Sequence, residues 1–236
     1  MKAPPKSSPV EVFIDQFKRN FHHTGAVVPS SRALARAMAA FIGQGDAPRR
    51  ILEAGPGTGV FTAVIAERMA PFDRLDVYEI NPVFADYLEK KFRTEPVFTS
   101  LAGRLTLHRA DVLNLPAEAT YDRIISSIPM NNFEPAWVND LLGTFMAHLT
   151  PAGVLSYFEY VLIRTIKSVV SSRQERERLR GVGEVTSRFV ELYQVRCDHV
   201  LLNLPPAVAR HLVKPLTTKL AITKGARGLR PVAAVQ

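Results

Sequence analysis

The stretch that decides the fold is Ile51-Leu52-Glu53-Ala54-Gly55-Pro56-Gly57-Thr58-Gly59. Its first residues are mostly apolar and predict a buried strand, and a helix is predicted over about residues 60–69 directly after it. The three glycines at alternate positions let the backbone turn tightly and approach a ligand closely. Their spacing differs from the G-x-G-x-x-G pattern of dinucleotide-binding proteins. The stretch therefore predicts a strand, a glycine turn and a helix, with a ligand at the turn.

A second signal follows at the distance that a nucleoside ligand requires. Residues 74–78 predict another strand, and Glu79-Ile80-Asn81-Pro82 comes directly after it. An acidic residue at the end of a second strand, about twenty residues after a glycine loop, can accept hydrogen bonds from both ribose hydroxyls. The alternative is a glycine turn without a ligand and a surface glutamate. We favour the nucleoside site because the two signals depend on each other and both fit.

Length and composition place this chain among single-domain proteins with a full core. It has 236 residues, 47% of them hydrophobic, and contains no run of eighteen apolar residues that would span a membrane. Residues 1–9 are polar and proline-rich, unlike a secretory signal, and the single Cys197 excludes internal disulfides and a cysteine metal cluster. We therefore expect a cytoplasmic protein without a metal. The net charge of +8 favours a polyanionic partner, either nucleic acid or an anionic membrane surface.

Strands and helices alternate after residue 49, which is typical of an α/β fold with a mostly parallel sheet and helices on both faces. We predict strands at about 50–54, 74–79, 104–108, 122–126 and 153–158, and helices at about 60–69, 82–93, 134–149 and 161–179. Residues 195–202 and 207–213 predict a strand, the turn at 203–206 and a returning strand. The chain thus closes with an antiparallel hairpin.

The segments outside this core divide the chain into three predicted parts: residues 1–48, 49–213 and 214–236. Ser8, Pro9 and Glu11 predict a helix start. An apolar stripe follows, with Lys18 and Arg19 beside it; it consists of Val10, Phe13, Ile14, Phe17 and Phe21. This helix either packs on the core or lies in a membrane surface, where it could also cover the site. A second helix is predicted over about 32–42. The tail from Lys214 carries five cations and no acid, and we expect it to grip phosphates or simply to aid solubility.

The pattern E-x-G-x-G-x-G resembles the first motif of the class I S-adenosylmethionine-dependent methyltransferases. The resemblance implies S-adenosylmethionine as the cofactor and a seven-stranded Rossmann-like sheet. The loop would hold the amino acid end of the cofactor through Glu53, Gly55, Gly57, Thr58 and Gly59. Glu79 would bind the ribose with Ile80 and Asn81 beside it, and Asp111, followed by Val112, would meet the adenine amine. The alternative for Asp111 is an ordinary turn aspartate.

The methyl acceptor of such enzymes lies after the fourth strand, here Ser126-Ser127-Ile128-Pro129-Met130-Asn131-Asn132-Phe133. We expect Pro129 to shape this loop, and backbone carbonyls with Ser127, Asn131 or Asn132 to accept hydrogen bonds from an amine. An amine with a lysine-like pKa must first lose a proton, which costs roughly 4 kcal/mol at pH 7. A dry pocket would lower that cost. The motif contains no His or Glu, so no dedicated general base is predicted, and both asparagines could be plain turn residues.

A narrower resemblance covers about residues 10–213. Gly25-Ala26-Val27-Val28-Pro29-Ser30-Ser31, the glycine motif, Glu79-Ile80-Asn81-Pro82 and Ser127-Ile128-Pro129-Met130 together resemble the bacterial soluble-type phospholipid N-methyltransferases. That family methylates phosphatidylethanolamine stepwise towards phosphatidylcholine. The resemblance implies that Ser30 or Ser31 helps to hold the cofactor. It also implies that Phe13 and Phe17, with Lys18 and Arg19, bind the inner face of the cytoplasmic membrane.

The acceptor loop departs from that family, which usually has S-G-x-P where this chain has Ser126-Ser127-Ile128-Pro129. The departure leaves open another amino lipid, such as an ornithine lipid. A ribosomal RNA adenine N-methyltransferase is a second alternative, but its loop reads N-[LI]-P-[YF], with an aromatic that stacks on the flipped base. This chain has Ser127 and Met130 at those two positions. A methyltransferase of a small soluble amine and a cofactor-binding protein without turnover are further alternatives. We favour a peripheral membrane enzyme that methylates a phospholipid amine and does not act on nucleic acid.

Overall fold

The structure is a computed structural model that describes residues 31–45, 47–161, 172–203 and 205–215. Several predictions therefore lie outside the described residues. They are the membrane-facing stripe with Phe13, Phe17, Lys18 and Arg19, the cofactor-binding role of Ser30, and nearly all of the basic tail.

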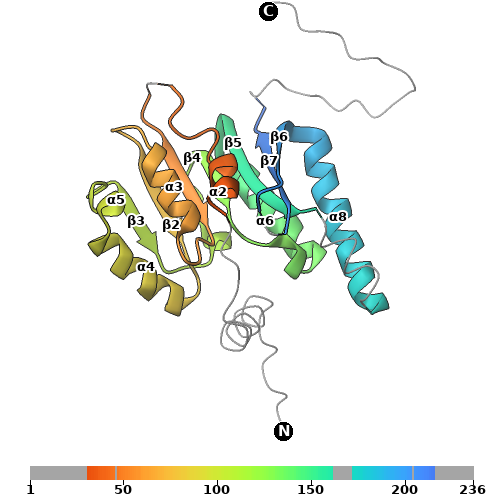
Figure 1. Cartoon of the computed structure of the whole chain (residues 1–236). Helices are drawn as coiled ribbons and strands as arrows, with labels where there is room; N and C mark the ends of the chain where they lie inside the picture. The colour runs from red at the N-terminus through yellow and green to blue at the C-terminus, as the bar shows by residue number, and fades with distance from the viewer. Residues whose placement is uncertain (1–30, 46, 162–171, 204, 216–236) are drawn as a thin grey trace, which may run out of the picture.

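A seven-stranded sheet forms the centre of the chain, in the order β3-β2-β1-β4-β5-β7-β6 (Figure 1). Strands β1 to β5 pair in parallel, and β7 runs antiparallel to both of its neighbours. The strands are β1 (Arg50–Ala54), β2 (Arg74–Tyr78), β3 (Leu105–His108), β4 (Tyr121–Ser126), β5 (Leu149–Tyr160), β6 (Gln194–Val200) and β7 (Ala207–Val213). This order, with its closing antiparallel strand, confirms the predicted class I methyltransferase sheet.

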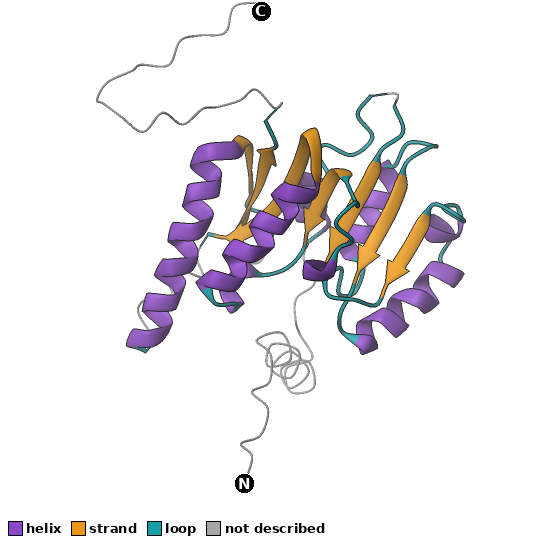
Figure 2. Ribbon diagram, turned by 180° about the vertical axis from the view of Figure 1, so that it is seen from behind, coloured by secondary structure: helices purple, strands orange, loops and turns teal. Residues whose placement is uncertain are grey.

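Helices cover both faces of the sheet and explain why its central strands are apolar. They are α2 (Arg32–Met38), α3 (Val60–Arg68), α4 (Pro82–Thr94), α5 (Pro96–Thr99), α6 (Pro135–His148) and α8 (Arg173–Tyr193). Figure 1 shows α2 and α3 in front of the sheet, and Figure 2, from behind, shows α6 and α8 on the opposite face. One buried cluster lies on each face, built around Ile51 and Ile65 on the first and Leu52 and Phe145 on the second. Because β1 is enclosed on both faces, Ile51 and Leu52 are both buried.

Side-chain caps set where three helices begin. Ser31 accepts a hydrogen bond from the amide of Leu34 at the start of α2, and Asn81 accepts one from Val83 at the start of α4. Ser172 accepts one from Glu175, so α8 begins at Arg173 and runs to Tyr193. The prediction of a helix over 161–179 was therefore wrong in its continuity at Ser172 and in its end, while its residues 162–171 lie outside the described residues. The reason is the capping box Ser172-Arg173-Gln174-Glu175, which starts a helix where the prediction placed the middle of one.

The carboxyl ends of the parallel strands meet at one edge of the sheet, where ligands bind in folds of this kind. The chain changes direction across the sheet between β1 and β4, which are neighbours in it. Two backbone hydrogen bonds hold the loops together there: the amide of Gly55 donates to Tyr78, and the amide of Ser127 donates to Ala54. The glycine loop thus lies between the loops that follow β2 and β4.

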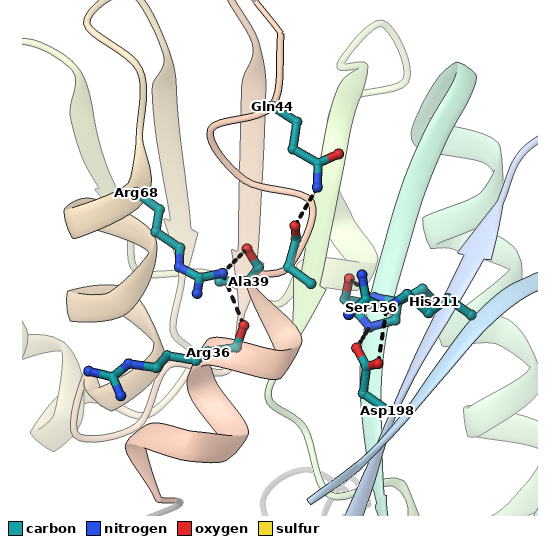
Figure 3. Close-up of polar contacts among 9 residues, drawn as sticks. Arg36, Ala39, Gln44, Arg68, Ser156, Asp198 and His211 are labelled. Carbon is teal, nitrogen blue, oxygen red and sulfur yellow. Dashed lines mark hydrogen bonds and ion pairs between the residues drawn. The ribbon is translucent and has the colours of Figure 1, made fainter.

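Two groups of polar contacts fasten the outer elements to this centre (Figure 3). Arg68 of α3 donates to the carbonyls of Arg36 and Ala39, which satisfies acceptors at the end of α2.

On β7, His211 bridges two other strands, because its Nδ1 lies 2.8 Å from Ser156 Oγ and its Nε2 lies 3.2 Å from Asp198 Oδ2. These residue types resemble a hydrolase triad. However, both Ser156 and His211 are buried, so this group links β5, β7 and β6 rather than meeting a substrate. Burial also lowers the pKa of His211, despite the nearby Asp198.

Candidate active site

The glycine loop turns through three left-handed residues, with φ of +69° at Gly55, +56° at Gly57 and +80° at Gly59. A Cβ on Gly55 would lie 2.7 Å from Cγ1 of Ile128, so this glycine lets the loop pack against the segment after β4. A Cβ on Gly57 would meet no atom within 4 Å. Gly55 therefore lets the loop pack closely against its neighbour. Gly57 leaves the backbone open to a ligand, as a bound cofactor requires.

Glu79 lies directly beside this loop. Its Oε2 accepts a hydrogen bond from the Gly57 amide at 3.1 Å, and its Oε1 accepts one from the Asn81 amide at 2.8 Å. Burial raises the pKa of Glu79, and these backbone amides lower it, so they favour the charged form. The structure thus brings the predicted acidic residue and the predicted glycine loop together. The side chain of Asn81 caps α4, and Ile80 is exposed at the rim.

Among the described acidic residues, Glu53 has the pKa that is shifted most. It is completely buried, and neither carboxylate oxygen has a hydrogen-bond partner in the part of the chain that the structure describes. Burial raises its pKa to about 8; Thr62 offsets part of this rise, and the charge of Glu79 adds to it. An unpaired buried carboxyl at the base of the glycine loop fits a cationic ligand group, such as the ammonium of an amino acid.

The remaining predicted cofactor residues have local structural roles as well. Asp111 accepts a hydrogen bond from the Leu113 amide at 3.0 Å and caps the short 3-10 helix η1 (Val112–Asn114), while Val112 is buried in the core. The amide of Ser31 donates to Asn203 at 2.8 Å. The carbonyl of Thr58 accepts a hydrogen bond from Lys91 at 3.3 Å. All of these residues lie at the carboxyl edge of the sheet or on loops that reach it. Their contacts with a cofactor stay predictions.

The acceptor loop is held by an arginine from the other end of the sequence. Pro129 precedes the 3-10 helix η2 (Met130–Asn132). Arg178 of α8 donates to the carbonyl of Asn131 at 2.7 Å and to the carbonyl of Phe133 at 2.5 Å. Glu175 accepts two hydrogen bonds from the same guanidinium, and this raises the pKa of Arg178. The loop is therefore positioned by α8.

A pocket of about 70 Å³ opens beside this loop. Three of the predicted acceptor residues line it, namely Pro129, Asn131 and Asn132, together with Met130. The fourth, Ser127, does not line it, and its buried hydroxyl has no partner among the described residues. The other lining residues were missed by the sequence analysis; they are Phe158, Glu159, Tyr160 and Thr186. They come from the end of β5 and from α8, far along the chain from the motif, so no local pattern could have identified them.

Glu159 is the one charged residue that lines this pocket in the described structure. Its side chain is only 12% exposed, and its Oε2 lies 3.2 Å from Nε of Arg210. Elsewhere in the described chain, no group of His, Cys, Asp or Glu side chains is arranged to hold a metal ion. None of the described helices is long and apolar enough to cross a membrane.

Comparisons with known proteins match part of this chain to methyltransferases. Residues 51–153 match the family described as "Methyltransferase domain". The ornithine lipid N-methyltransferase of Singulisphaera acidiphila is 28% identical over 145 residues, which cover 61% of this chain and 74% of that protein. The ribosomal RNA small subunit methyltransferase A of Prochlorococcus marinus is 27% identical over 169 residues, which cover 69% of this chain and 56% of that protein.

Solved structures of other methyltransferases share this fold. An O-methyltransferase from Bacillus cereus, solved in complex with S-adenosylhomocysteine, superimposes with a TM-score of 0.58 at 15% identity and covers 89% of this chain and 92% of that one. Its likeness shows the fold. Together with the domain match and the cofactor-like geometry around Gly57 and Glu79, it confirms the expectation of S-adenosylmethionine as cofactor. Residues 51–153 thus match a methyltransferase domain, and the described chain has the class I methyltransferase fold with S-adenosylmethionine as its cofactor.

Proposed function

We propose that this enzyme methylates the head-group amine of a membrane amino lipid. The observation that carries the proposal is the match over 61% of the chain to a protein named ornithine lipid N-methyltransferase. The pocket beside Pro129 supports it, because this pocket lies at the carboxyl edge of the sheet next to the glycine loop and contains a carboxylate suited to a cationic head group.

The chain's own residues would bind the cofactor and aim the acceptor. The amides of the glycine loop and the buried Glu53 would take the amino acid end, and Glu79 would take the ribose hydroxyls. When bound, S-adenosylmethionine supplies a methyl carbon that forms its new bond with the nitrogen lone pair as its bond to sulfur breaks, the electron pair staying on sulfur and the surplus proton of the nitrogen passing to water. The segment from Pro129 to Asn132, held by Arg178, would fix the direction of the attacking nitrogen.

The carboxyl edge of the sheet also carries exposed apolar side chains, which support a lipid acceptor. Leu201 and Leu202, in the turn between β6 and β7, are 78% and 87% exposed. This turn lies beside the end of β5, because Ala207 pairs with Tyr160, which itself lines the pocket. Two adjacent exposed leucines at the mouth of the site would enter the boundary of a bilayer. The predicted stripe with Phe13 and Phe17 and the basic tail would add to this docking on an anionic surface, at the inner face of the cytoplasmic membrane.

The docking surface is tested by replacing both leucines with Asp and measuring binding to anionic vesicles. Burial of a leucine side chain contributes about 1.5–3 kcal/mol, so partial insertion of two predicts binding that is about 10- to 100-fold weaker. Phe72 provides a matched control, because it is 71% exposed but precedes β2 at the opposite edge of the sheet. Phe72→Asp should leave vesicle binding unchanged. Equal binding by the wild type and the leucine variant would contradict the orientation of this edge towards the membrane.

The acceptor itself is tested with labelled S-adenosylmethionine and vesicles that contain either an ornithine lipid or phosphatidylethanolamine. The name of the related protein favours the ornithine lipid as acceptor, and the resemblance of residues 10–213 to phospholipid N-methyltransferases favours phosphatidylethanolamine. Label in the ornithine lipid alone would reject the step towards phosphatidylcholine. Label in neither lipid would reject the lipid proposal.

Methylation of ribosomal RNA is the second candidate, since a protein named ribosomal RNA small subunit methyltransferase A is 27% identical to this chain over 169 residues. The acceptor loop has the buried Met130 at the position where those enzymes carry the aromatic that stacks on the flipped base, although Phe158 and Tyr160 also line the pocket. Labelled RNA after incubation with ribosomal RNA and the labelled cofactor would overturn the lipid proposal. RNA binding would also weaken steeply with added salt.

A further inference from the structure

We propose that Glu159 is the residue that recognises the positively charged amine of the acceptor. The inference rests on the proposed function, because it names the chemical group that the acceptor pocket selects. That group is a primary ammonium, which an ornithine lipid and phosphatidylethanolamine share.

The position of Glu159 in the pocket supports this role. It is the one acid among the residues that line the pocket, and Pro129 and Asn131 line the same pocket from the acceptor loop. Those two residues belong to the segment where class I methyltransferases place the acceptor. An ammonium bound there would therefore lie between this carboxylate and the acceptor loop after β4.

Burial makes the charge of Glu159 selective. Its side chain is 12% exposed, so water screens the carboxylate only weakly, and its attraction for a cation in the pocket is correspondingly stronger than at the surface. The other lining residues are apolar or uncharged; they include Phe158, Tyr160 and Thr186. A cation is thus the ligand that this pocket accommodates best.

Arg210 holds Glu159 in place without filling the pocket. Its Nε lies 3.2 Å from Oε2 of Glu159, while its NH1 group donates to Gln194 at 2.7 Å. Arg210 is not among the residues that line the pocket. A carboxylate can accept several hydrogen bonds at once, so Glu159 can bind an ammonium while it keeps this arginine.

The carboxylate of Glu159 can also assist the methyl transfer that the proposed function requires. Positive charge leaves the sulfur and develops on the nitrogen as the new bond forms. The bound ammonium first gives one proton to water, since only the neutral amine has a lone pair. The fixed carboxylate then stabilises the positive charge that develops on the nitrogen as the methyl carbon bonds to it and the carbon–sulfur bond breaks. We therefore assign Glu159 to binding and orientation of the amine rather than to removal of its proton.

The test compares ligands that differ only in the amine. Short-chain phosphatidylethanolamine is paired with short-chain phosphatidylethanol, and Nα-hexanoyl-ornithine with Nα-hexanoyl-norvaline. Binding to the protein loaded with S-adenosylhomocysteine is followed by the fluorescence of Trp137, the only tryptophan, which stacks on Phe133 of the acceptor loop at 4.1 Å between ring centroids. The wild type should bind at least one amine ligand about 10- to 100-fold more tightly than its amine-free partner.

Glu159→Gln should abolish that preference while it leaves the affinity for S-adenosylhomocysteine unchanged, and Glu159→Asp should restore part of it. Glu177→Gln is the matched control, because Glu177 is a surface residue of α8 outside the pocket and should keep the full preference. A wild type without amine preference, or a Gln variant that retains it, overturns the inference. A preference that depends on Glu159 in a protein that methylates neither lipid would support the inference and reject the proposed function. The pair of ligands that shows the preference identifies the source of the ammonium.

Discussion

Glu53 makes the stability of this protein depend on pH in a way that can be calculated. Its carboxyl is fully buried, and its pKa rises from 4.5 to about 8, chiefly because burial penalises the charged form. The folded state therefore retains this proton over a range in which the unfolded chain has lost it. Folding is favoured most when both states are protonated, below about pH 4.5, and this advantage disappears as the pH rises to about 8 and above.

The size of the effect follows from that difference in pKa. For one group that titrates at 4.5 when unfolded and at about 8 when folded, the free energy of unfolding falls by about 3.5 kcal/mol between pH 5 and pH 8. Glutamine has nearly the same shape as the neutral acid and does not titrate. In Glu53→Gln this part of the pH dependence should be missing. The free energy of unfolding of the variant, relative to that of the wild type, should therefore rise by about 3.5 kcal/mol between pH 5 and pH 8.

Urea unfolding of both proteins, followed by circular dichroism at pH 5 and pH 8, measures this difference directly. The other titrating groups are common to both proteins and cancel in the comparison. A stability difference that is the same at both pH values would refute the raised pKa. S-adenosylhomocysteine adds an independent check: if its ammonium meets the Glu53 carboxylate, the ligand should stabilise the wild type more at pH 8 than at pH 5, and Glu53→Gln should lose that dependence.

Three further predictions concern the loops around the site. Glu79→Ala removes the acceptor of the Gly57 amide and the proposed ribose ligand, so calorimetry should show at least about tenfold weaker binding of S-adenosylhomocysteine, and unchanged affinity would contradict the ribose role. Gly55→Ala adds a Cβ 2.7 Å from Ile128 and should lower the melting temperature more than Gly103→Ala, which has a similar φ of +76° but no atom within 4 Å; equal losses would mean that only backbone strain matters. Arg178→Met removes the donors that hold the acceptor loop and should lower kcat without weakening cofactor binding, whereas a matching loss of both would indicate general unfolding.

The sequence by itself determined the parts of this protein that are local along the chain. Alternating strands and helices, the glycine loop after β1 and the acidic residue after β2 led to the correct class of sheet, and the bounds of β1 and β7 were correctly predicted. These features are readable because a strand, a tight turn and a helix start each depend on neighbouring residues. The start of α8 at Arg173 was mispredicted although its capping box is local, because Arg173, Arg176, Arg178 and Arg180 were interpreted as part of one longer basic helix face.

Only the tertiary structure decided what surrounds the acceptor loop. The motif after β4 contains no acid, yet the end of β5 brings Glu159 into its pocket, and α8 brings Arg178 to its carbonyls and Thr186 to its wall. These residues lie 27 to 57 positions after Pro129 to Asn132, and nothing in their own neighbourhoods marks them. The physical reason is that strand pairing and helix packing set such contacts through the buried area of the whole sheet, which no short window of sequence contains.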